Sequence, residues 1–140
     1  MKLAAARCRQ LLEGSEHGTL ATIHPGRGVD AVPACFVVAG NDLAIPVDRV
    51  KPKSSVQLTR IGNLDADSRA VLMCDHWDGD DWSVLWWVRA WLERRPVDVA
   101  QRARFESQLR DKYSQYVDQP FADLLVFRIT GVSGWSASPQ

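Results

Sequence analysis

The chain has 140 residues, of which 46% are hydrophobic and 24% are charged, which is typical of a globular protein and excludes a disordered one. This length predicts a single domain over residues 1–140. Lysine plus arginine and aspartate plus glutamate both number 17, so the formal net charge is zero. A neutral chain has no global field to attract nucleic acid or an anionic membrane, and any basic site must be local.

The sequence also indicates a compartment. No apolar run approaches the roughly 18 residues that a membrane span requires, and the N-terminus lacks the apolar core of a signal peptide. The cysteines Cys8, Cys35 and Cys74 are widely spaced and form no Cys-x-x-Cys pair. This pattern is typical of reduced, buried thiols, so we expect a cytoplasmic protein without disulfides.

The first half of the chain alternates short strands with turn signals. A helical stripe over residues 3–14 is followed by a strand over residues 18–24 and a return strand over residues 29–39. Pro33 inside the return strand predicts an edge, a bulge or a site, because proline cannot donate to a ladder. A third strand is expected over residues 43–47.

The second half is predicted to form two helices and three strands. One helix is capped by Ser54 or Ser55 and ends at residues 62–63, and the other begins with Pro96 as its first residue and ends at Arg110. The strands are expected at residues 69–75, 82–93 and 123–135. This order of about six antiparallel strands and a few short helices predicts a mainly β, α+β fold built on a small barrel.

Residues 51–55, Lys-Pro-Lys-Ser-Ser, place two cations and two hydroxyls immediately before a predicted helix. A helix N-terminus presents unpaired N–H groups and the positive end of the helix dipole, so this segment is a candidate phosphate site. A solvated basic loop followed by a serine cap is the alternative. No Walker-type loop or Gly-x-Gly-x-x-Gly sequence supports nucleotide binding by those routes.

Six tryptophans are many for this length, and five of them lie in residues 77–91. In strand geometry both faces of residues 82–93 are apolar, which predicts that one face packs into the barrel and the other against a partner subunit. A core strand with aromatic filler is the alternative. Arg89 lies among these rings and is expected to meet a carboxylate, a phosphate or an aromatic face, because an unpaired buried charge is costly.

Two other kinds of site are not indicated. The acidic residues in the segment 75–81 match neither an EF-hand nor a zinc motif, so we expect a solvated loop and no metal. No serine stands in a Gly-x-Ser-x-Gly elbow, so a hydrolase triad is unsupported.

Several segments together resemble one family. They are the hairpin GTLATIHPGRGVDAVPACFVV, the loop VDRVKPKSS, the segment RIGNLDADSRAVLMCDHWDGDDWSVLWWVR, and the tail pieces DKYSQY and GVSGWSAS. They resemble the pyridoxamine 5′-phosphate oxidase-like flavin and deazaflavin oxidoreductases, in particular small enzymes that depend on the deazaflavin F420. The resemblance covers nearly the whole chain, and the loop, the tryptophan-rich strand and the last tail piece are its most specific parts.

The resemblance implies a split β-barrel that forms a homodimer, with two cofactor sites in clefts between the subunits. By position, the residues that would hold the cofactor phosphate are Lys51, Lys53, Ser54 and Ser55. The residues expected beside the tricyclic ring are Val32, Pro33, Ala34, Cys35, Pro46, Val47 and Asp48. The residues expected to reach the site from the partner chain are Trp82, Trp86, Trp87 and Arg89.

The chain departs from the family pattern in ways that bear on the cofactor. Family hairpins often carry basic residues that favour flavin mononucleotide (FMN), but residues 30–34 carry none, which favours F420. The loop from Asp48 to Lys51 is one residue longer than usual, and Ser68 stands where a proline is common.

The function implied by the resemblance is hydride transfer between reduced F420 and a small organic substrate. The sequence assigns no catalytic side chain. The alternatives are an FMN-dependent oxidase or reductase on the same fold, a non-catalytic protein that stores or senses the cofactor, and a dimeric scaffold with an emptied site.

Overall fold

A computed structural model describes residues 1–48 and 55–139, without the side chains of residues 48 and 55–58. The helices in this part of the chain are α1 (Ala5–Gly14), α2 (Ser55–Ala66), α3 (Val99–Lys112) and the short 3₁₀-helices η1 (Trp82–Val84) and η2 (Ser114–Tyr116). The strands are β1 (Gly18–His24), β2 (Gly28–Ala34), β3 (Val37–Ala39), β4 (Asp42–Asp48), β5 (Arg69–His76), β6 (Trp86–Arg94) and β7 (Phe121–Ser136).

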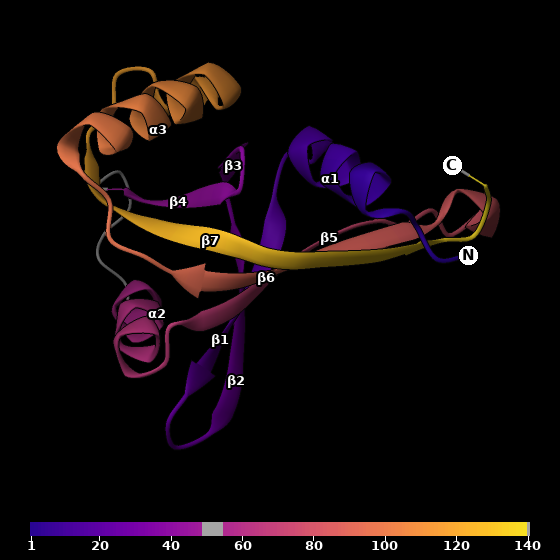
Figure 1. Cartoon of the computed structure of the whole chain (residues 1–140), viewed down its shortest axis with the longest axis horizontal. Helices are drawn as coiled ribbons and strands as arrows, with labels where there is room; N and C mark the ends of the chain where they lie inside the picture. Colours follow the sequence, from indigo (N-terminus) through magenta and orange to yellow (C-terminus); the bar gives the residue numbers. More distant parts are fainter. Residues whose placement is uncertain (49–54, 140) are drawn as a thin grey trace.

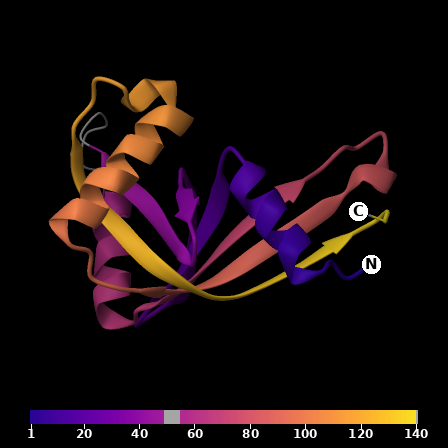
Figure 2. The ribbon, with the colours of Figure 1, turned by 45° about the horizontal axis from the view of Figure 1, so that its top comes forward.

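These strands form one antiparallel sheet in the order β2-β1-β5-β6-β7-β4-β3. The long strand β7 joins its two halves, because the C-terminal part of β7 pairs with β6 and the N-terminal part pairs with β4. The sheet bends strongly along β7, as Figures 1 and 2 show. This arrangement confirms the predicted mainly β, α+β fold class.

The core consists of two apolar clusters on opposite faces of β7. Successive side chains of a strand point to opposite faces, so Leu125 and Phe127 enter the larger cluster while Leu124 and Val126 enter the smaller one. The larger cluster includes Leu12 of α1, and the smaller one lies against α3. Figure 1 shows these two helices over different ends of β7. Burial on both faces explains why residues 124–127 of β7 form an uninterrupted apolar run.

The N-terminal residues run beside the end of β7. The Leu3 N–H donates to the Gly134 carbonyl oxygen at 2.9 Å, and the Ser136 N–H donates to the Met1 carbonyl oxygen at 2.9 Å. A Cβ at Gly134 would lie 2.8 Å from the Trp87 carbonyl oxygen and 3.0 Å from Cys8 Sγ. Glycine at this position therefore allows α1 to approach the β6–β7 ladder closely.

The prediction of one return strand over residues 29–39 is wrong. β2 ends at Ala34 and β3 begins at Val37, and Cys35 and Phe36 form a break between them. This break raises the strand number from the expected six to seven among the described residues. Pro33 lies in β2, which is the first strand of the sheet, so the expected edge position is confirmed.

The predicted strand over residues 82–93 begins too early. Residues 82–84 form η1, because the Asp81 carboxylate accepts hydrogen bonds from the backbone N–H and the hydroxyl of Ser83 and caps a helical turn. β6 begins only at Trp86.

Two predicted helix boundaries are also wrong. α2 continues past Gly62 and Asn63 to Ala66, because tertiary contacts of Asn63 hold it inside the helix. Pro96 lies before α3, whose N-cap is Asp98, and a capping box with Gln101 fixes the start of that helix.

Candidate functional site

A cavity of about 550 Å³ lies where the end of β2 and the end of α3 meet β4 and the segment that leads into β1. Its wall contains four of the residues predicted beside the cofactor ring: Pro33, Ala34, Cys35 and Pro46. Three of them belong to the end of β2 and the β2–β3 break, and the fourth belongs to β4. The fold therefore brings two sequence segments of the predicted site to one hollow.

The opposite wall comes from the junction of α3 and η2, where Tyr113 clamps the β2–β3 break. The Tyr113 hydroxyl accepts a hydrogen bond from the Phe36 N–H at 2.9 Å. Its own proton points to the carbonyl oxygens of Glu16 and Phe36, at 2.5 and 3.1 Å. Because Phe36 is fully buried, this clamp fixes the backbone that carries Cys35 into the cavity wall.

Lys112 is the second contact of this junction. Its ammonium nitrogen Nζ donates to the Phe36 carbonyl oxygen at 2.8 Å and lies 4.0 Å from the centre of the Phe36 ring. The side chain is half-buried and lines the cavity. Among the described residues of the wall, Lys112 is the one lysine and Arg60 the one arginine. The same wall contains the carboxylate of Glu16.

Burial sets the ionisation of these groups. It lowers the pKa of Lys112, although the nearby Cys74, Cys35 and Glu16 act in the opposite direction. It raises the pKa of the Tyr113 phenol far above its usual range, so this hydroxyl keeps its proton at neutral pH. Burial likewise raises the pKa of the Cys74 thiol in β5, and the nearby charge of Lys112 acts in the opposite direction.

Two smaller hollows that share lining residues with the cavity contain two more predicted residues. Val32 lines a hollow of about 310 Å³ that shares Arg60 with the cavity. Trp86 lines another of about 300 Å³ that shares Glu16 and His17 with the cavity. Val47 instead packs against the larger apolar cluster. Five of the seven predicted ring-side residues and one of the three predicted tryptophans thus line the cavity or a hollow that shares residues with it.

Trp87 and Arg89 lie on the outer face of the sheet and away from the cavity wall. The Arg89 guanidinium carbon lies 5.2 Å from the centre of the Trp87 ring and 5.0 Å from that of Trp91. Its Nε–H also donates to the Ser133 hydroxyl at 3.1 Å. The sequence prediction that Arg89 meets an aromatic face is confirmed.

Trp82 lies at the exposed tip formed by η1, with 64% of its surface accessible and its ring 5.7 Å from that of Trp77. Within one chain the structure does not bring Trp82, Trp87 or Arg89 to the cavity.

The predicted phosphate residues Lys51, Lys53 and Ser54 lie outside the described residues. Ser55 is the first residue of α2, and Asp48 is the last residue of β4. The side chains of both also lie outside the description.

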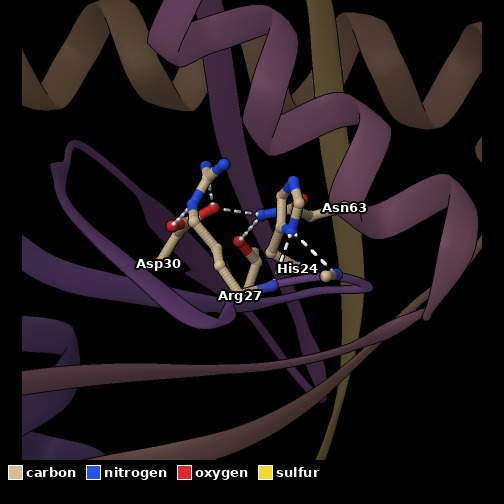
Figure 3. A network of polar contacts seen from close by, with 6 residues as sticks. His24, Arg27, Asp30 and Asn63 are labelled. Carbon is tan, nitrogen blue, oxygen red and sulfur yellow. Dashed lines mark hydrogen bonds and ion pairs between the residues drawn. The ribbon is translucent and has the colours of Figure 1, made fainter.

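A polar network fixes α2 to the β1–β2 hairpin (Figure 3). The Asn63 Nδ2 group is buried and donates to Thr22 Oγ1 at 3.0 Å and to Asp30 Oδ2 at 2.8 Å. Asp30 also accepts two hydrogen bonds from the Arg27 guanidinium, at 3.0 and 2.8 Å. The bonds from Arg27 and Asn63 lower the pKa of Asp30. This network positions the helix that carries Arg60 into the cavity wall.

Two kinds of feature are absent from the described residues. No group of three histidine, cysteine, aspartate or glutamate side chains there could hold a metal ion. No helix in that part of the chain is long and apolar enough to cross a membrane.

Known proteins resemble this chain in structure rather than in sequence. No family model and no curated protein matches it. The FAD-binding protein from Mycobacterium smegmatis is 18% identical, with 96% of each chain covered and a TM-score of 0.65. A structure from Corynebacterium glutamicum that is assigned as a pyridoxamine 5′-phosphate oxidase is 12% identical. The match covers 97% of this chain and 98% of that one, with a TM-score of 0.60. A structure named F420 reductase is 19% identical, covers 89% and 94%, and has a TM-score of 0.62.

The chain has the split β-barrel fold of these proteins. The resemblance stated from the sequence is thereby confirmed at the level of the fold. Identities below 20% carry the architecture and leave the ligand to the chain's own residues.

Sequence reasoning assigned no role to Arg60, Lys112 or Tyr113, which the structure places in the cavity wall. Lys112 and Tyr113 belong to the segment DKYSQY, which is one of the segments that resemble the family. That segment was the one feature of the sequence that could have pointed to these two residues. Their part in the site depends on contacts with Phe36, 76 and 77 positions away in sequence. Periodicity within one element carries no information about contacts over that distance.

Proposed function

We propose that this protein is an oxidoreductase that binds a flavin-type cofactor in the 550 Å³ cavity, with F420 as the preferred cofactor. The hydride would pass between that cofactor and a small organic substrate. The observation that carries the proposal is the convergence of Pro33, Ala34, Cys35 and Pro46, all expected beside the ring, on one cavity wall.

The residues of the wall fit such a group. Cavities that hold a cofactor commonly measure about 300 to 1,000 Å³, and this one lies within that range. Pro33 and Ala34 present short side chains beside the strand backbone, which leaves room for a flat ring. The cationic side chains of Arg60 and Lys112 suit a cofactor that carries anionic groups.

F420 is favoured over FMN because β2 carries no basic side chain at residues 30–34. The only charged residue in that stretch, Asp30, is engaged by Arg27 and Asn63. FMN remains the second candidate, and the segment with Lys51 and Lys53 would hold the phosphate of either cofactor.

The cofactor, when bound, supplies the hydride chemistry, and the protein's residues orient it and exclude water. Tyr113 holds its proton against the carbonyl oxygens of Glu16 and Phe36 and keeps the β2–β3 break in place. It therefore acts on the shape of the wall. Cys35 presents a half-buried thiol in the same wall.

The proposed working unit is a homodimer joined through the outer face of the β5–β6–β7 sheet. Met73, Trp91 and Trp135 remain 39 to 40% exposed on this face. Large apolar side chains gathered on one face of a sheet are typical of a protein interface. In a dimer, Trp82, Trp86, Trp87 and Arg89 of one chain would approach the cavity of the other, as the resemblance implies.

Titration of the purified protein with F420 and with FMN, followed by the fluorescence of the cofactor, tests this proposal. F420 is expected to saturate one site per chain and to bind more tightly than FMN. Tight FMN binding without F420 binding would overturn the choice of cofactor, and binding of neither would overturn the proposed function. Reoxidation of reduced F420 only with an added acceptor separates an enzyme from a protein that stores the cofactor.

The variant with both Lys51 and Lys53 replaced by alanine provides the matched test of the phosphate segment. It is expected to bind either cofactor more weakly. Unchanged affinity would mean that this segment is a solvated loop.

A further inference from the structure

Lys112 carries a charge that its protein surroundings only partly satisfy. The ammonium group can donate three hydrogen bonds, and one goes to the Phe36 carbonyl oxygen. The Phe36 and Tyr113 rings lie 4.0 and 5.2 Å from Nζ and contribute a cation–π attraction. Among the described carboxylates, none lies within 4.0 Å of Nζ.

This position is unlike that of the other half-buried cations on α3. Arg102 and Arg110 of the same helix both form ion pairs with Glu106. Lys112 is half-buried at the helix end, and burial lowers its pKa, which means that its charge is partly removed from water. A charged group held in a wall without a carboxylate partner is stabilised when an anion enters the adjoining hollow.

The fold also fixes where this ammonium group lies. Phe36 is fully buried and bonded to the Tyr113 hydroxyl, and the same Phe36 carbonyl holds Lys112. The long lysine side chain is thus already ordered before any ligand binds. Ordering in advance lowers the entropy cost of ligand binding and makes the contact more effective.

We propose that Lys112 is the anion-binding residue of the cavity and that its ammonium group contacts a negatively charged oxygen of the ligand held there. This inference rests on the proposed function for the identity of the ligand, and the oxygen can belong to the cofactor or to a substrate carboxylate or phosphate. Both sources share the same chemistry, a compact oxyanion that accepts hydrogen bonds from a lysine.

Lys112→Met tests the proposal, because methionine keeps an unbranched apolar side chain and removes the charge. Lys112→Arg keeps the charge and serves as the conservative variant. Arg104→Met, an exposed position on the same helix, removes one positive charge elsewhere and is the matched control. Circular dichroism and thermal unfolding first establish that all three proteins are folded.

Two measurements are made on each variant. The first is the dissociation constant for F420 and for FMN, from cofactor fluorescence. The second is the rise in melting temperature caused by inorganic phosphate, at constant ionic strength, with and without cofactor.

Lys112→Met is expected to weaken cofactor binding by about 10- to 100-fold if the oxygen belongs to the cofactor. If it belongs to the substrate, cofactor binding stays within about twofold, and the variant loses the melting-temperature rise that phosphate causes in the cofactor-bound protein. Lys112→Arg restores most of either effect, and Arg104→Met reproduces neither.

A Lys112→Met protein that matches the wild type in both measurements would overturn the proposal. This failure is distinct from that of the proposed function. If the wild type binds neither F420 nor FMN, the proposed function fails, and the phosphate measurement on the cofactor-free protein still decides whether Lys112 binds anions.

Discussion

Replacement of Asn63 by alanine tests whether the network at the β1–β2 hairpin holds α2 in place. Asn63 is 2% exposed and donates one hydrogen bond to Thr22 Oγ1 and one to Asp30 Oδ2. Each hydrogen bond contributes about 1 kcal/mol, and the space left by the missing amide adds to the loss. We expect the free energy of unfolding to fall by about 2 to 4 kcal/mol.

For a chain of this length, such a loss lowers the melting temperature by roughly 6 to 12 °C. Urea unfolding followed by tryptophan fluorescence measures the loss in free energy of unfolding. All samples are kept at one protein concentration, because an oligomer's apparent stability depends on concentration. Gln108→Ala, at an exposed amide on α3, is the control and should stay within about 0.5 kcal/mol of the wild type.

The same variant should weaken cofactor binding, because α2 carries Arg60 into the cavity wall. A loss of stability below about 1 kcal/mol would refute the reasoning that the buried amide network stabilises the fold. A destabilised protein with unchanged affinity for F420 would instead show that the position of α2 does not affect the site. Combination with Asp30→Ala should give less than the sum of the single effects, since the two residues share a hydrogen bond.

Three further predictions concern packing, pH and assembly. Gly18→Ala places a Cβ 2.8 Å from the Met73 carbonyl oxygen and should lower stability by about 1 to 3 kcal/mol in urea unfolding, whereas Gly14→Ala, with open space around it, should not. Because the pKa of Asp30 is lowered in the folded state, its stabilising contribution is complete above the unfolded pKa of about 4 and disappears as pH falls through the folded value. The difference in melting temperature between wild type and Asp30→Asn should therefore narrow at acid pH, and a constant difference would contradict this. Trp91→Asp should convert the proposed dimer to monomers in analytical ultracentrifugation, and an unchanged mass would remove this sheet face as the interface.

Several elements could be predicted from local sequence alone. The strand over residues 18–24 is confirmed to the residue as β1, and the strand-forming residues Leu20, Thr22 and Ile23 before a turn signal indicated it. The edge position of Pro33 also followed from one local property, the missing N–H. Resemblance over nearly the whole chain indicated the split barrel, which the comparisons confirm at the level of the fold.

The errors lie where distant contacts decide. Residues 62–63 look like a helix end, but Asn63 finds buried partners on β1 and β2, and the helix continues. The run of residues 29–39 looks continuous, but the hydroxyl of Tyr113 and the ammonium group of Lys112 bind Phe36 and interrupt it. Such hydrogen bonds outweigh intrinsic propensity, which differs by only about 1 kcal/mol per residue.

The sequence by itself determined the neutral charge and most of the order of helices and strands, because these follow from composition and periodicity. The residues expected beside a cofactor ring were implied by the family resemblance alone. Only the tertiary structure decided that Pro33, Ala34, Cys35 and Pro46 share one cavity. It alone also placed a lysine from the end of α3 in that cavity's wall, since the β2–β3 break and α3 are close only after the sheet has folded. The charge that the sequence balances overall is thus unbalanced locally, at the half-buried ammonium group of Lys112.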